Sequence, residues 1–93
     1  MKMNINMKKI VFLGAFAQEA TIKEAEVAYT KEDYGKAIEL YEGLLKTHGE
    51  SAEIYYNLGN AYYKENKIAP AILNYERALL LDPGDGDIRF NLQ

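Results

Sequence analysis

Cysteine and tryptophan are absent from this sequence of 93 residues, and histidine occurs once, at His48. Without cysteine, the chain has no disulfide to hold a small fold together and no thiol for catalysis. A single histidine without cysteine also leaves too few ligands for a zinc site and no nucleophile–base pair. His48 falls near the end of a predicted helix, where we expect it to interact with the helix C-terminus.

Other motifs of catalysis and ligand binding are missing as well. The sequence has no glycine-rich phosphate-binding loop. Aspartates at 82, 85 and 87 suggest a calcium loop, but their spacing is wrong, and Gln93 stands where the closing glutamate would fall. The sequence therefore predicts no catalytic residue, no metal and no cofactor, and a protein that is not an enzyme.

Basic residues are few and do not cluster. The net charge is −3, and Lys2, Lys8 and Lys9 are the only charged residues among the first seventeen. Residues 18–93 therefore carry 8 basic and 14 acidic groups, a net charge of −6. Nucleic-acid binding needs clustered lysine and arginine, so this function class is excluded. An acidic body promotes solubility and favours a basic partner.

The first seventeen residues have the organisation of a secretory signal peptide. Lys8 and Lys9 precede an apolar run over residues 10–17, which ends on the small residues Ala15 and Ala17. The run is too short to span a bilayer, which takes roughly 20 residues. Cleavage after Ala17 would place the protein in the periplasm or cell envelope. In the alternative interpretation, residues 1–17 are a retained apolar leader helix that docks on a groove, a neighbouring chain or a membrane surface, and the protein stays in the cytoplasm.

A repeat of 34 residues organises the rest of the chain. A period of this length indicates stacked helical or mixed supersecondary units. The units are residues 18–51, residues 52–85 and a truncated third unit or cap over residues 86–93, together one domain over residues 18–93. The residues that recur at this interval are Tyr29/Tyr63, Ala37/Ala71, Ile38/Ile72, Tyr41/Tyr75, Glu42/Glu76 and Leu45/Leu79.

Apolar periodicity predicts helices over residues 19–31, 34–47, 52–65 and 68–81, and a short one over 86–93. Small residues at Gly59 and Ala71 indicate a close approach of two helices, and Asn66 suits a left-handed turn. Pro70 fits a first helical turn, and Pro83-Gly84 ends the last long helix. The expected packing stripes are Tyr55, Leu58, Gly59 and Tyr62 on one helix, and Ile68, Ala71, Ile72, Tyr75, Ala78 and Leu79 on the next.

These residues resemble the tetratricopeptide-repeat family. Residues 52–85 supply the family pattern with tyrosine in place of its tryptophan and phenylalanine, whereas residues 18–51 match less well, with Glu24 for the leucine and Gly49 for the proline. The resemblance implies an all-α fold, an α-solenoid of antiparallel helix hairpins that forms a right-handed superhelix of about two and a half repeats. Stable arrays usually need three repeats. The chain is therefore a fragment of a longer protein, or is capped by residues 86–93, or associates with a second copy.

The resemblance also implies a function, which is non-catalytic binding of a peptide or protein segment in the concave groove. The corresponding residues are common in the family regardless of ligand, so a scaffold role is the second interpretation. Glu26 and Asp87 occupy positions where family members that clamp an acidic tail carry amide or basic side chains, so we expect a basic or apolar partner. The candidate contacts are Glu26, Tyr29, Glu53, Tyr56, Asn57, Asn60, Tyr63, Lys64 and Phe90.

A narrower resemblance covers residues 55–64, 71–79 and 87–92. They look like the exported tetratricopeptide component of the Bat aerotolerance system of Bacteroides-type bacteria. This resemblance implies an envelope scaffold that works beside membrane-anchored proteins. The alternative function is structural self-assembly into a homodimer or larger oligomer, through Phe90, the region around Ile22 or the apolar N-terminal segment.

Overall fold

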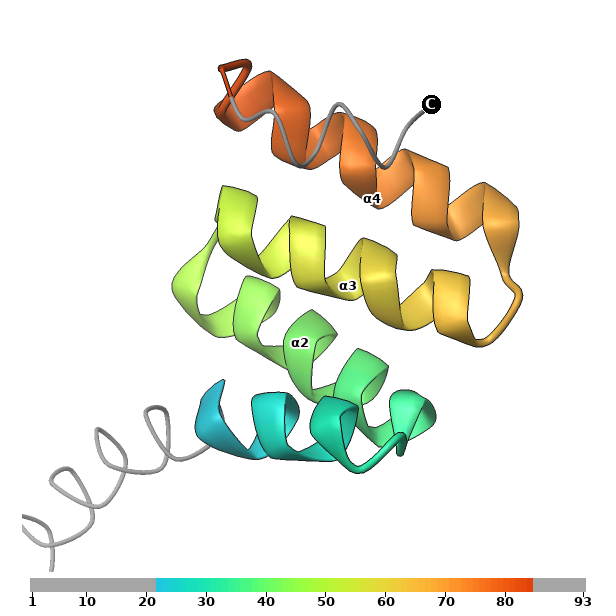
Figure 1. The fold of residues 1–93 in the computed structure, drawn as a ribbon. Coiled ribbons are helices and arrows are strands. Elements are labelled where there is room, and N and C mark those ends of the chain that lie inside the picture. The colour runs from blue at the N-terminus through green and yellow to red at the C-terminus, as the bar shows by residue number, and fades with distance from the viewer. Residues whose placement is uncertain (1–21, 85–93) are drawn as a thin grey trace, which may run out of the picture.

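The computed structural model describes residues 22–84. Within this range the regular structure is entirely α-helical, as predicted. Residues 22–30 are helical, and α2 (Tyr34–His48), α3 (Ala52–Lys64) and α4 (Ile68–Leu81) follow. Consecutive helices run antiparallel and stack side by side, so that the order in space follows the order in sequence (Figure 1). The predicted leader, the short helix over 86–93 and Phe90 lie outside the described residues.

The turns inside the two helix hairpins are the same structure, 34 residues apart. Asn66 has the predicted left-handed conformation, with φ 62°. Glu32, at the matching position of the first repeat, has φ 65°, which the sequence did not indicate because glutamate rarely adopts this conformation. The backbone hydrogen bonds that close these turns run from Asp33 N to Ala28 O at 2.8 Å and from Lys67 N to Tyr62 O at 2.9 Å.

The ends of the helices follow from local side-chain chemistry. Asp33 accepts from the Lys36 amide at 3.4 Å and caps α2, and Ser51 caps α3 in the same way. Gly49, with φ 87°, ends α2. Pro70 lies in the first turn of α4, as predicted, where its missing N–H costs no helical hydrogen bond.

The core consists of two clusters, one between the first hairpin and α3 and one between α3 and α4. The predicted close approach is confirmed, since a Cβ on Gly59 would lie 3.2 Å from the carbonyl oxygen of Ala71. The first cluster is Ala25, Ala28, Ala37, Tyr41, Leu44, Leu58 and Ala61. The second is Tyr55, Ala71, Tyr75 and Ala78.

The predicted packing stripe of α4 is wrong at two positions. Ile68 and Ile72 are 45% and 43% exposed, whereas Asn74, which the predicted stripe does not include, is only 4% exposed. Around the axis of α4, the buried face is centred on the side that carries Ala71 and Ala78, and Ile68 and Ile72 lie at the edge of this face. When apolar residues occupy most of the circumference of a helix, their pattern does not determine which side faces the neighbouring helix. In α4 the side that faces α3 is determined by the Tyr75 ring, which packs against Gly59.

Candidate functional site

A groove lies where the helix over residues 22–30 faces α3. One pocket of about 290 Å³ is lined by Glu26, Tyr29, Thr30, Tyr41, Glu53 and Asn57. A second pocket of about 230 Å³ is lined by Ile22, Glu26, Tyr41, His48, Ser51, Glu53, Ile54 and Asn57. The two pockets share Glu26, Tyr41, Glu53 and Asn57, so they form one continuous groove. The structure thus brings together four of the predicted contact residues, Glu26, Tyr29, Glu53 and Asn57.

Tyr41 forms the floor of the groove and was missed by sequence reasoning. Its side chain comes from α2, is only 3% exposed and lines both pockets. Burial, with smaller contributions from the nearby carboxylates of Glu26 and Glu53, raises the pKa of Tyr41 to about 12. A side-chain hydrogen bond with Asn57 acts in the opposite direction. The repeat marks Tyr41 as a packing residue, and no sequence signal distinguishes a buried ring from one that also lines a pocket.

The groove is acidic. Glu26 and Glu53 are both exposed and flank Tyr41, one from the first helix and one from α3. Among residues 22–84, neither lysine nor arginine lines either pocket of the groove. A cationic side chain that enters the groove would therefore meet two carboxylates.

Two further predicted contacts, Tyr56 and Asn60, are engaged by α4. The ring of Tyr56 packs against Tyr75 with centroids 5.9 Å apart and a tilt of 47°. The hydroxyl of Tyr75 donates to Oδ1 of Asn60. Both residues are half-buried. They hold α3 against α4, and their direct contact with a ligand stays a prediction.

The remaining predicted contacts extend the wall toward the C-terminal end of α3. Tyr63 is 59% exposed and Lys64 is exposed, and neither lines the groove. Burial raises the pKa of Tyr29, while the charge of Lys64 lowers it by a smaller amount. Tyr29 also packs edge-on against Tyr34, with ring centroids 5.3 Å apart.

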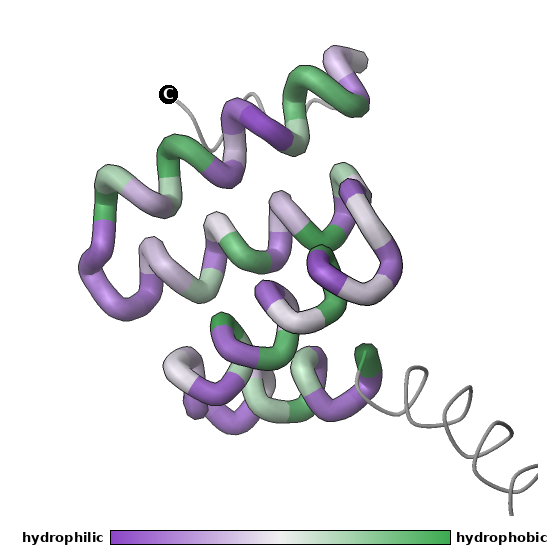
Figure 2. The backbone as a smooth tube through the Cα atoms, turned by 180° about the vertical axis from the view of Figure 1, so that it is seen from behind, coloured by the Kyte–Doolittle hydropathy of each residue, from purple (hydrophilic) through white to green (hydrophobic). Residues whose placement is uncertain are grey.

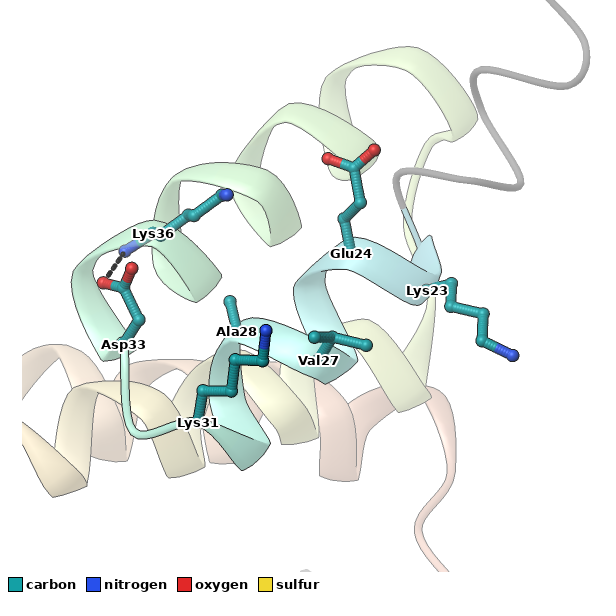
Figure 3. A pocket seen from close by; sticks show the side chains of 7 residues that line it. All are labelled: Lys23, Glu24, Val27, Ala28, Lys31, Asp33 and Lys36. Carbon is teal, nitrogen blue, oxygen red and sulfur yellow. Dashed lines mark hydrogen bonds between the residues drawn. The ribbon is translucent and has the colours of Figure 1, made fainter.

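Another pocket, of about 220 Å³, lies on the outer side of the first hairpin (Figure 3). Figure 3 shows Lys23 extending away from Lys31 and Lys36, so these three cations do not converge on one point. Asp33 and Glu24 lie among them, and Asp33 is engaged as the cap of α2. The pocket thus has no concentrated charge of either sign.

Two classes of site are absent from residues 22–84. No group of three or more histidine, aspartate or glutamate side chains in this range is arranged to hold a metal ion. None of the helices in the same range has the length and apolar character to cross a membrane.

Comparison with known proteins fits this geometry. The family model of the tetratricopeptide repeat matches residues 52–85. Residues 52–85 are a tetratricopeptide repeat. The peroxisomal targeting signal receptor of Saccharomyces cerevisiae is 34% identical over 64 residues, which are 69% of this chain and 10% of that protein. The chain thus spans about a tenth of the length of this relative. A tetratricopeptide repeat indicates a module for protein–protein interaction.

Proposed function

We propose that this chain is a non-catalytic interaction module that holds an extended segment of a partner protein in the groove between the first helix and α3. The observation that carries the proposal is the continuous groove over Tyr41, with pockets of about 290 and 230 Å³. The tetratricopeptide match supports a protein partner, and the yeast relative is by name a receptor for a targeting signal.

The partner segment carries a basic residue next to an apolar one. Glu26 and Glu53 offer two carboxylates to the basic side chain over Tyr41. The pocket of about 290 Å³ beside these carboxylates is large enough to admit a long side chain. Ile22 and Ile54 line the adjoining pocket and suit an apolar side chain.

Peptide binding tests this function directly. The probes are fluorescent peptides that differ only in one central pair: arginine–leucine, glutamate–leucine or arginine–serine. We expect the arginine–leucine peptide to bind most tightly, and the Glu26→Gln/Glu53→Gln variant to weaken its binding about 3- to 10-fold, since two partly exposed ion pairs are lost. A matched control is Glu24→Gln/Glu39→Gln, which removes two exposed glutamates outside the groove. Equal binding of all three peptides, or equal effects of the two variants, contradicts the proposal.

We place the module in the cell envelope, as a scaffold beside membrane-associated proteins. The organisation of residues 1–17 as a signal peptide and the resemblance to the exported Bat component support this location. The intact mass of protein recovered from a bacterial host that exports such signals tests it. A chain that begins at Gln18 supports export, and a chain that retains Met1 contradicts it.

A further inference from the structure

The outer surface of α4 carries leucines where the first repeat carries charges. Leu73 is 45% exposed and Leu80 is 82% exposed. The matching residues 34 positions earlier are Glu39 and Lys46, which are exposed on α2. Figure 2 shows the result, hydrophobic segments on both sides of the hydrophilic stretch in the middle of α4. Since α2 forms the same kind of helix with charges at these positions, the fold does not require the leucines, and an exposed apolar pair of this kind indicates a docking surface.

The two leucines point away from the rest of the domain. Leu73 and Leu80 each lie two residues after an alanine, Ala71 or Ala78, that is buried against α3. Two residues correspond to a rotation of about 200° around a helix, so both leucines face away from α3. They are seven residues apart, or about 10.5 Å along the axis, and lie on one stripe. We call this pair the leucine stripe.

Opposite charges flank the leucine stripe at its centre. Glu76 and Arg77 are three and four residues after Leu73, so they lie on opposite sides of the stripe. Both are exposed. The guanidinium carbon of Arg77 is 5.9 Å from the ring centroid of Tyr55, a contact that restrains the side chain while leaving it open to solvent. They are the only charged residues of α4.

We propose that a second copy of this chain docks on the leucine stripe, with the two α4 helices parallel and related by a two-fold axis. In this arrangement each leucine meets its own counterpart, as in the seam of a parallel helix pair. Glu76 of each chain then faces Arg77 of the other, so the surface is complementary to itself. An antiparallel pair would instead place Glu76 beside Glu76 and Arg77 beside Arg77. A pocket of about 400 Å³, lined by Glu76, Leu79, Leu80 and Pro83, provides space beside the stripe.

Sedimentation equilibrium of the full chain tests the contact. The protein concentration should run from about 10 μM to about 1 mM, because one helix face of this size gives only a weak dimer. We expect the mass to rise from 10.6 kDa toward twice that value. The variant Leu73→Glu/Leu80→Lys, which copies the first repeat, should remain monomeric with unchanged helical circular dichroism. The control Glu39→Gln/Lys46→Gln, which changes the matching positions of α2, should behave like the wild type.

Charge exchange tests the parallel arrangement. Glu76→Arg alone and Arg77→Glu alone should each raise the dimer dissociation constant at least about twofold, and the two together should restore it. A wild-type chain that is monomeric over the whole range overturns the proposal, and so does a dimer unaffected by Leu73→Glu/Leu80→Lys. Binding of monomeric wild type, but not of this leucine variant, to phosphatidylcholine vesicles would identify a membrane as the occupant instead. Because the stripe and the groove lie on different surfaces, peptide binding in the groove is unaffected by any of these outcomes.

Discussion

The ring of Tyr75 on α4 lies directly against Gly59 on α3. A Cβ on Gly59 would be 2.6 Å from both Cδ1 and Cε1 of that ring. The first repeat has Ala25 and Tyr41 at the matching positions, and both are buried. The first repeat therefore accommodates the methyl group of Ala25 at this position. In the second repeat the Tyr75 ring lies so close to α3 that only the hydrogen of Gly59 fits beside it.

We predict that Gly59→Ala destabilises the domain. Alanine favours a helix by about 1 kcal/mol relative to glycine, but the added methyl group must displace the buried Tyr75 ring. Overpacking of this kind costs about 1–3 kcal/mol, so the free energy of unfolding should fall, as measured by urea denaturation. Since the first repeat tolerates Ala25, we expect a shift of α4 rather than loss of the fold.

Gly43→Ala is the matched control for this substitution. Gly43 also lies inside a helix, α2, but no heavy atom lies within 4 Å of the added Cβ. The same change should therefore raise the free energy of unfolding by about 0.5–1 kcal/mol through helix propensity. If Gly59→Ala and Gly43→Ala change the free energy of unfolding equally, the contact between residue 59 and Tyr75 does not affect stability.

The paired turns give a second prediction. Glu32 and Asn66 occupy the same left-handed conformation, which asparagine tolerates better than glutamate. Glu32→Asn should raise the free energy of unfolding by about 0.5–1 kcal/mol, or the melting temperature by a few degrees, and Asn66→Glu should lower it by a similar amount. Thermal unfolding followed by circular dichroism measures both. If both variants shift the free energy of unfolding in the same direction, the left-handed conformation shared by Glu32 and Asn66 does not control the stability of the turns.

The helices were predictable because their ends depend on local chemistry. The expected ranges 34–47, 52–65 and 68–81 differ by at most one residue from α2, α3 and α4. The side chain of Ser51 caps the start of α3, and Gly49 ends α2 with a positive φ. Pro83, which lacks an N–H, follows the end of α4. Each of these effects acts within one helical turn, so it can be predicted from neighbouring residues. The rotation of α4 about its axis was not predictable in this way, because Ile68 and Ile72 are as apolar as the residues that are buried.

The groove was predictable only in part. Glu26, Tyr29, Glu53 and Asn57 line it, because the matching positions of a repeat occupy matching places in the stack, and their contact with a ligand stays a prediction. Tyr41 was missed because its ring belongs to the core while its position also forms the floor of the groove. The engagement of Asn60 by Tyr75 depends on a contact between two helices, which periodicity does not specify.

The buried tyrosines predict a loss of stability at alkaline pH. Burial raises the pKa of Tyr41 and of Tyr75 to about 12, compared with about 10 in the unfolded chain. Below pH 10 both states are protonated, so these groups produce no pH dependence. As the pH rises from 10 to 12 the unfolded state loses its protons first, and each tyrosine removes up to about 3 kcal/mol from the free energy of unfolding. Urea denaturation at a series of pH values should show this decline, and Tyr41→Phe should reduce its slope. If the free energy of unfolding has already reached its lowest value below pH 10, groups other than Tyr41 and Tyr75 cause the loss of stability.

Asn74 gives the last prediction, because its side chain is buried and its amide oxygen lacks a hydrogen-bond partner among the described residues. Nδ2 donates to the carbonyl oxygen of Pro70 at 2.8 Å, and Oδ1 has no hydrogen-bond partner among the residues that the structure describes. A buried polar atom without a partner costs about 1–3 kcal/mol. The first repeat has Leu40 at the matching position, packed against its own core. Asn74→Leu should therefore raise the free energy of unfolding by about 1 kcal/mol or more.

Asn74→Ala separates the polar effect from packing, since it removes the same oxygen without adding apolar volume. We expect its effect to fall below that of Asn74→Leu, because alanine leaves a small cavity. Urea denaturation of the full chain measures both variants. If both variants destabilise the protein, the prediction is wrong, and the hydrogen bond from Nδ2 to the Pro70 carbonyl oxygen outweighs the cost of the buried Oδ1.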